Sequence, residues 1–429
     1  MTSLDYPIAE RTLGNGLRVI ISPDHAAPAV AVNLWYDVGS RHEDAGRTGF
    51  AHLFEHVMFQ GSAHVKPGEH IAVMQSAGAS VNATTWFDRT NYFEALPLGG
   101  LELALWLEAD RMGTLLDALT QENLDTQREV VKEEKRQRYD NVPYGDVMER
   151  LVRLTFPAGH PYAHTTIGSM ADLDAASLDD AHAFFRAHYM PNNAVLTLVG
   201  DVEPNQGFAL TERYFGGLSA QSHVPVEPVA ALGPISGSPR EESSADVPAD
   251  AVYLTWRLPQ LGTPEFDAVD LALSVLGQGQ TSRLHQHLVR TAELAEGAGA
   301  SSLGLIGGNS FGFVSARCRD GVSPEKIEAE LVNDLQVLTH QGPTDDELSL
   351  AKAQFERSWL QVMARVEARA DQISSFATLQ DDPELINKRI AQIEAIDAAA
   401  ITQAAQEHLG VGDQATLVYR TSDNARLAA

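Results

Sequence analysis

The chain contains almost no cysteine and few basic residues. Its 429 residues include one cysteine, Cys318, which excludes an internal disulfide, a cysteine-rich zinc site and a CxxC redox motif. Lysine and arginine total 31 against 58 aspartate and glutamate residues, which gives a formal net charge of −27. This deficit argues against nucleic acid and anionic membranes, because both are bound through basic side chains. We therefore expect no nucleic-acid partner.

Long apolar runs are also missing. No stretch approaches the roughly 20 apolar residues that span a bilayer, so we expect no membrane span. The first residues lack the basic and apolar regions of a secretory signal. We therefore expect a cytoplasmic protein, or a periplasmic one if an export signal has been removed. The 44% of hydrophobic residues suffice for a buried core, and at about 100–200 residues per domain the length predicts two domains or more.

The order of the expected elements repeats weakly along the chain. Residues 219–248 are rich in Ser, Pro and Gly and predict a linker between domains at 1–218 and 249–429. In both 173–199 and 396–419, a helix that ends near a histidine leads through a short polar loop to an aliphatic strand. We predict an α+β fold of two homologous domains, each a mostly antiparallel sheet covered by helices. The alternative is one large mixed domain with an insert.

A helix expected near residue 50 carries the strongest functional signal. Apolar residues of 50–58 recur at helical spacing on one face, and Thr48 is a plausible N-cap. His52, Glu55 and His56 share another face, one turn apart. Two such imidazoles can bind one metal ion, and the intervening carboxylate can then reach a water on that metal. The alternative is a pair of surface histidines on an amphipathic helix.

Two histidines leave a tetrahedral zinc ion short of a third protein ligand. The helix predicted over 121–138 offers acidic residues, and Val130 and Val131 would mark its buried stripe. Glu134 falls on that stripe, where a carboxylate is costly unless it is paired or coordinated. Glu134 is therefore our choice for the third ligand, with Glu133 as the fallback. The alternative is that Glu134 pairs with an arginine.

Together these residues resemble the pitrilysin/insulinase family of zinc metallopeptidases, the inverted zincins with an HxxEH motif. The resemblance spans nearly the whole chain and is carried by segments 49–61, 81–97, 128–134, 160–173 and 277–284. It is greatest to the short bacterial members, which are similar to the subunits of the mitochondrial processing peptidase. It implies a zinc endopeptidase that cleaves peptides. One Zn²⁺ per chain would be bound by His52, His56 and Glu134, with Glu55 as general base.

The resemblance also implies how a peptide would bind. Asn82 and Ala83 match the strand that pairs with an extended substrate in the family. Many members have a glutamate seven residues before the ligand glutamate, and Gln127 stands at that position here. Active single-chain members use an arginine and a tyrosine of the second half at the substrate carbonyl. Arg290 matches the arginine, whereas Glu296 stands about where the tyrosine would be.

This departure shapes the expected partner. We expect the chain to be the zinc-bearing subunit of a heterodimer whose homologous partner carries the Arg/Tyr pair, or otherwise a homodimer. The alternative function is that of a noncatalytic structural subunit, as in the family's respiratory-complex relatives. Those relatives typically lose zinc ligands, so the complete set in this sequence argues for the peptidase.

Overall fold

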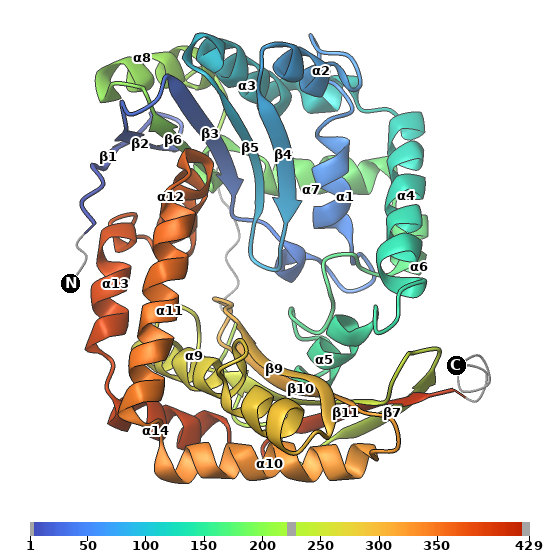
Figure 1. Ribbon diagram of the computed structural model, residues 1–429. Helices are drawn as coiled ribbons and strands as arrows, with labels where there is room; N and C mark the ends of the chain where they lie inside the picture. Colours follow the sequence, from blue (N-terminus) through green and yellow to red (C-terminus); the bar gives the residue numbers. More distant parts are fainter. Residues whose placement is uncertain (1–3, 221–228, 423–429) are drawn as a thin grey trace. The chain divides into compact units, whose positions relative to one another are not determined.

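A computed structural model describes residues 4–220 and 229–422, and they form two compact units (Figure 1). The first unit comprises residues 1–135, 164–227 and 358–390, and the second comprises residues 136–163, 228–357 and 391–429. Each unit thus takes a segment from the opposite half of the chain. The ranges 1–218, 219–248 and 249–429 predicted from the sequence did not include this exchange. Residues 221–228 of the predicted linker lie outside the described residues. Another part of that linker, Arg240–Ala245, forms strand β7.

The first unit is built on a six-stranded sheet of order β1-β2-β6-β3-β5-β4. Its strands are β1 (Ala9–Thr12), β2 (Arg18–Pro23), β3 (Ala29–Tyr36), β4 (Ser80–Thr85), β5 (Thr90–Pro97) and β6 (Ala194–Gly200). β6 runs parallel to β2, and the other pairs are antiparallel. β3 and β6 are almost entirely buried, as expected for central strands whose two faces are both covered.

The second unit contains a five-stranded sheet of order β7-β11-β8-β10-β9. Besides β7, its strands are β8 (Ala251–Leu258), β9 (Ala295–Leu303), β10 (Ser310–Cys318) and β11 (Ala415–Thr421). β11 runs parallel to β7 and antiparallel to β8. In the first sheet, β6 likewise runs parallel to β2 and antiparallel to β3. The strand order β2-β6-β3-β5-β4 of the first sheet therefore has the same topology as the order β7-β11-β8-β10-β9 of the second. The predicted α+β fold with an internal duplication is confirmed.

Helices cover the sheets of both units. The described helices and helical turns of the first unit are η1 (Ser40–His42), α1 (Phe50–Val57), α2 (Glu69–Ser76), η2 (Leu98–Gly100), α3 (Leu101–Ala118), α4 (Gln121–Lys135), α6 (Met170–Ala175), α7 (Leu178–His188), η4 (Pro191–Asn193), α8 (Pro204–Phe215) and α12 (Val366–Leu379). Those of the second unit are η3 (Arg136–Asp140), α5 (Val147–Thr155), α9 (Pro264–Gly277), η5 (His285–Thr291), α10 (Pro324–Gln341) and α14 (Ala398–His408). The division between the units falls within α11 (Asp345–Met363) and α13 (Leu385–Ala395). Across the described residues, no helix is long and apolar enough to span a membrane.

The exchange between the halves of the chain is reciprocal. α12 packs on β3 and β6 of the first sheet, where the Ser374 and Thr197 hydroxyls are 2.8 Å apart (Figure 1). α5 packs on β8 and β11 of the second sheet, where the Thr155 and Thr255 hydroxyls are 2.9 Å apart. Each sheet is therefore completed by a helix that is distant in sequence.

Candidate metal centre

Helix α1 begins differently from the prediction. Gly49 occupies the N-cap in a left-handed conformation, with φ of 93°, and makes no side-chain cap. The carboxylate of Glu43 instead accepts hydrogen bonds from the backbone N–H groups of Gly49 and Ala51, each at 2.8 Å. The Thr48 hydroxyl is engaged elsewhere, because it donates to Asp172 at 2.7 Å. The prediction of Thr48 as N-cap is therefore wrong: a carboxylate from an earlier turn takes that role.

Glu43 is a buried support of α1 that sequence reasoning missed. The Nε2 atom of His164 lies 2.9 Å from the Glu43 carboxylate and 3.0 Å from the carbonyl oxygen of Ser40. Both of these are acceptors, so Nε2 carries the proton and donates. Burial raises the pKa of Glu43, while the contact with His164 opposes that rise. A carboxylate at a helix N-terminus is favoured by the helix dipole, and here it fixes the start of the HxxEH helix.

The structure brings His52, His56 and Glu134 together. The Nε2 atoms of His52 and His56 lie 3.7 and 3.3 Å from the Oε2 atom of Glu134. The potential ligand atoms of the three residues all lie within 4.8 Å of one another. Ligand atoms of a tetrahedral zinc ion are about 3.3–3.6 Å apart, as follows from zinc–ligand bonds of about 2.0–2.2 Å. Two imidazole nitrogens and one carboxylate oxygen at this spacing fit zinc.

The position of Glu134 follows from the buried stripe of α4, although that stripe differs from the prediction. Its buried residues are Leu124, Gln127 and Val131, whereas Val130 is 43% exposed, so the predicted burial of Val130 is wrong. The stripe advances by three or four residues per turn and continues from Val131 to Glu134. Glu133 lies next to this stripe and is exposed.

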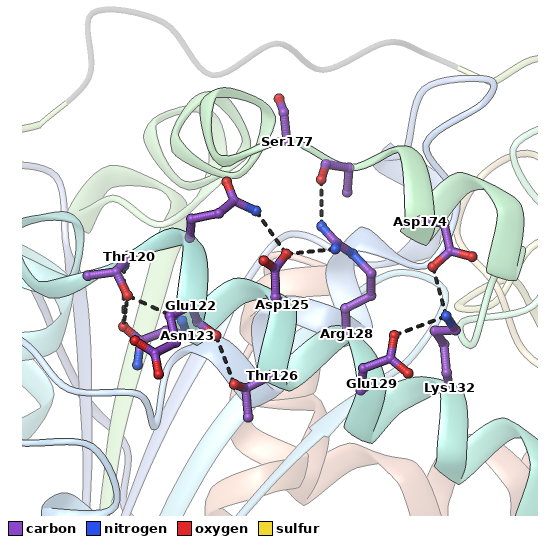
Figure 2. Close-up of polar contacts among 12 residues, drawn as sticks. Thr120, Glu122, Asn123, Asp125, Thr126, Arg128, Glu129, Lys132, Asp174 and Ser177 are labelled. Carbon is purple, nitrogen blue, oxygen red and sulfur yellow. Dashed lines mark hydrogen bonds and ion pairs between the residues drawn. The ribbon is translucent and has the colours of Figure 1, made fainter.

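Polar contacts link α4 to the C-terminal end of α6 and to the residue that follows it, as Figure 2 shows. Arg128 donates to the backbone oxygen of Ala176 at 2.6 Å. Lys132 donates to Asp174 at 2.9 Å and to Glu129 at 3.0 Å. Helix α4 ends at Lys135 and passes into the π-helical turn η3, whereas the sequence predicted one helix to residue 138. Glu134 thus lies in the last turn of a helix that is held to α6 and Ala176 through Arg128 and Lys132.

Glu55 lies between the two histidines and is oriented by the neighbouring strand. Its Oε2 atom accepts a hydrogen bond of 2.6 Å from the hydroxyl of Thr85, at the end of β4. Burial raises the pKa of Glu55, and the bond from Thr85 opposes that rise. Sequence reasoning missed Thr85. The alternation along β4 could have indicated it, because Thr85 lies on the same buried face as Ala83, whereas Asn82 is exposed on the other face.

The remaining predicted residues belong to several elements. Asn82 and Ala83 belong to β4, which packs beside α1 and is an edge strand of its sheet (Figure 1). Within the described strands, β4 pairs only with β5. Gln127 is buried on α4. Arg290 and Glu296 are exposed residues of the second unit, on η5 and β9.

Two models of known protein families match the chain. Residues 18–169 match the model described as insulinase, peptidase family M16, and residues 175–355 match the model described as the peptidase M16 inactive domain. The chain belongs to the insulinase family of peptidases. The resemblance stated from the sequence is thereby confirmed. The match to the inactive domain lies in the part of the chain that has no HxxEH motif.

Individual relatives of this M16 chain include proteins named zinc proteases. The zinc protease PqqE of Helicobacter pylori is 29% identical over 418 residues, which cover 95% of this chain and 91% of that protein. An uncharacterised zinc protease of Mycobacterium bovis is 26% identical over 402 residues, or 93% of this chain and 90% of that protein. The crystal structure of a protease from Helicobacter pylori superposes with a TM-score of 0.91 at 28% identity, over 97% of this chain and 99% of that one.

Proposed function

We propose that the chain is a zinc-dependent endopeptidase that hydrolyses peptides or unfolded segments. The observation that carries this proposal is the convergence of His52, His56 and Glu134 around one point, with the carboxylate of Glu55 beside them. Zinc bound there would supply Lewis-acid chemistry, polarising a carbonyl group and acidifying a water molecule.

The chain's own residues would then handle the proton. The Glu55 carboxylate, held by Thr85, is placed to accept a proton from the attacking water and to return it to the leaving amine. Its pKa, raised by burial, makes it a stronger base than an exposed glutamate. The side chains of His52 and Glu134 are 12% and 15% exposed, so the site is sheltered but remains open to a substrate.

An extended peptide would bind along β4. The outer edge of this strand presents backbone N–H and C=O groups beside the helix that carries Glu55, and Asn82 is exposed there. Backbone pairing of this kind gives affinity with a loose sequence preference. Such a mode suits an enzyme that acts on unfolded segments of varied sequence.

The proposal extends to a partner subunit. The second unit offers Arg290 but has Glu296 about where active single-chain relatives have a tyrosine. One missing donor to a developing oxyanion typically costs about 10²–10³ in rate. We therefore place this chain as the zinc-bearing subunit of a heterodimer whose homologous partner supplies the Arg/Tyr pair, with a homodimer as the other arrangement.

A noncatalytic structural subunit is the alternative. Its support is the fold, which is shared at a TM-score of 0.80 and 15% identity with a chain of complex III from Candida albicans. A further neighbour, described as a peptidase M16 inactive domain from Pseudomonas fluorescens, has a TM-score of 0.82 at 19% identity. At these identities the likeness concerns the fold alone. The complete donor set at α1 and α4 favours the peptidase.

The substitution Glu55→Gln separates the two functions. It removes the base but no ligand, so zinc content should stay at the wild-type level while turnover of an unstructured peptide falls by about 10²–10⁴. Glu133→Gln, an exposed neighbour of the site, is the matched control and should change neither. Near wild-type cleavage by the zinc-loaded Glu55→Gln protein would refute the role of Glu55. A zinc-loaded wild type that cleaves nothing, alone or with its partner, would favour the structural alternative.

A further inference from the structure

A second group of potential metal ligands lies inside the first unit. His70 comes from α2, Glu94 from β5 and Glu108 from α3, and their ligand atoms all lie within 4.8 Å of one another. The Nε2 atom of His70 is 3.5 Å from the Oε1 atom of Glu94 and 3.7 Å from the Oε1 atom of Glu108. These separations match those of 3.3 and 3.7 Å between the histidines and Glu134. The two distances from His70 are longer than charge-assisted hydrogen bonds, which are about 2.7–2.9 Å.

The cluster is closed to solvent. Glu94 and Glu108 are 0% exposed and His70 is 3% exposed. The Oε2 atom of Glu94 is buried and accepts no hydrogen bond. A buried carboxylate oxygen without a partner is costly unless it binds an ion or a water molecule. The orphaned oxygen is therefore an independent sign that something further binds here.

The charges of the cluster also favour a bound cation. Arg111, itself buried, holds the carboxylate of Glu108 through its Nε atom at 3.0 Å and through its Nη2 atom. It also lies over the ring of Tyr92, 4.2 Å from the ring centroid. One guanidinium beside two carboxylates leaves one negative charge without a partner. Carboxylates that ligate metals are commonly held from behind by such hydrogen bonds.

We propose that His70, Glu94 and Glu108 form a second, buried site for a divalent transition-metal ion such as Zn²⁺. One imidazole nitrogen and two carboxylate oxygens are a donor set that zinc accepts. The three ligands stand on three different elements, so the ion would join α2, β5 and α3. Because the site is closed to solvent, its role would be structural rather than catalytic.

The proposed ion would also support the segment that follows the HxxEH helix. Phe59 lies just beyond α1, and its ring meets the ring of His70 edge-on, with 5.7 Å between centroids. The guanidinium of Arg111 lies over the ring of Phe59, 5.0 Å from its centroid. The proposal nevertheless stands apart from the peptidase function, because it concerns different ligands.

The competitor for this site is a proton. Without a cation, burial raises the pKa of Glu108 to about 8 and also raises that of Glu94, so one proton could neutralise the pair beside Arg111. A metal ion and a proton differ in a direct observable, the zinc content of the folded protein. That content can be measured where the first site has been removed.

The test uses the full chain carrying His52→Ala and Glu134→Ala, purified, stripped with chelator, reloaded with Zn²⁺ and dialysed. The wild type should hold about two zinc ions per chain and this variant about one, by elemental analysis. Adding Glu94→Gln, which keeps the shape and removes the charge, should weaken the remaining zinc by at least about tenfold in a chelator competition. Cobalt substitution would report the same loss as a change in the visible spectrum.

The controls make every outcome decisive. Glu129→Gln, an exposed residue of α4, should leave the remaining zinc in place, and circular dichroism should show that each variant is folded. A folded His52→Ala/Glu134→Ala protein that holds no zinc would overturn the proposal and assign the cluster to a shared proton. The same conclusion would follow if Glu94→Gln bound zinc as tightly as its parent. Neither result depends on whether the protein cleaves peptides.

Discussion

The two units share one sheet topology but use the helix beside the edge strand differently. In the first unit α1 lies against edge strand β4, and in the second α9 lies against edge strand β9. In both, a hydroxyl of the edge strand donates to a carboxylate of the helix: Thr85 to Glu55, and Ser302 to Asp270. Only α1 adds histidines next to that carboxylate. The duplicated fold thus supplies a helix–strand contact twice, and a group of potential metal ligands is added to one copy.

In the second unit, helix α9 packs closely against edge strand β9. A Cβ atom added to Gly277, at the end of α9, would lie 2.1 Å from the backbone nitrogen of Ala300 on β9. Helix and strand therefore meet backbone to backbone at that point. In α1 the residues that face away from the core include half-buried His52 and His56, which leave the site open. The second copy is therefore closely packed at this point, whereas the first leaves its potential metal ligands partly exposed.

The largest expected effect comes from making the first unit resemble the second. Glu134→Ala removes one of three ligands, so zinc affinity should fall by about 10²-fold or more and peptide cleavage should be lost with it. Glu133→Ala is the matched control, because that side chain is exposed one residue away. Zinc titration with a competing chelator measures both. Loss of zinc from Glu133→Ala together with retention by Glu134→Ala would reverse our assignment.

A somewhat smaller effect should come from supplying what the second unit lacks. If a homologous partner provides the Arg/Tyr pair, adding it to this chain should raise the rate of peptide cleavage by about 10²–10³-fold. The measurement is the cleavage rate of an unstructured peptide at fixed concentration of this chain, with increasing partner. Full activity of the isolated chain, unchanged by the partner, would contradict the divided site.

The smallest expected effect sharpens the comparison of the two hydroxyl–carboxylate contacts. Thr85→Val removes the hydrogen bond to Glu55 without a large change in volume, and kcat should fall by about tenfold because the base is less well oriented. Ser302→Ala removes the corresponding bond to Asp270 in the second unit and should leave kcat unchanged. Equal losses from the two substitutions, with both proteins folded, would show that the contacts act only through stability.

Much of this fold could be predicted from local patterns. The helix and strand predicted within 173–199 are α7 and β6, and those predicted within 396–419 are α14 and β11, because periodicity and end signals mark them. Helix α1 was predicted from its spacing, and the duplication from the repeated helix–strand pair. Strand β9 was missed, since its run of Ala, Gly and Ser carries no apolar alternation. Strand β7 was assigned to the linker because its composition is polar.

The rest could not be predicted because it depends on tertiary contacts. The capping of α1 by Glu43 and the bond from Thr85 to Glu55 join residues that no local pattern links. The exchange of α5 and α12 between the two halves of the chain likewise depends on packing. The structure brings Glu134 next to His52 and His56, although Val130, half of the argument for choosing it, is exposed.

The most direct test of the central claim is to locate zinc in crystals of the full chain by anomalous scattering at the zinc absorption edge. The account predicts a peak within about 2.0–2.2 Å of the Nε2 atoms of His52 and His56 and of a Glu134 carboxylate oxygen. It predicts no such peak at α9 of the second unit. A zinc-replete crystal with no peak between α1 and α4 would contradict it.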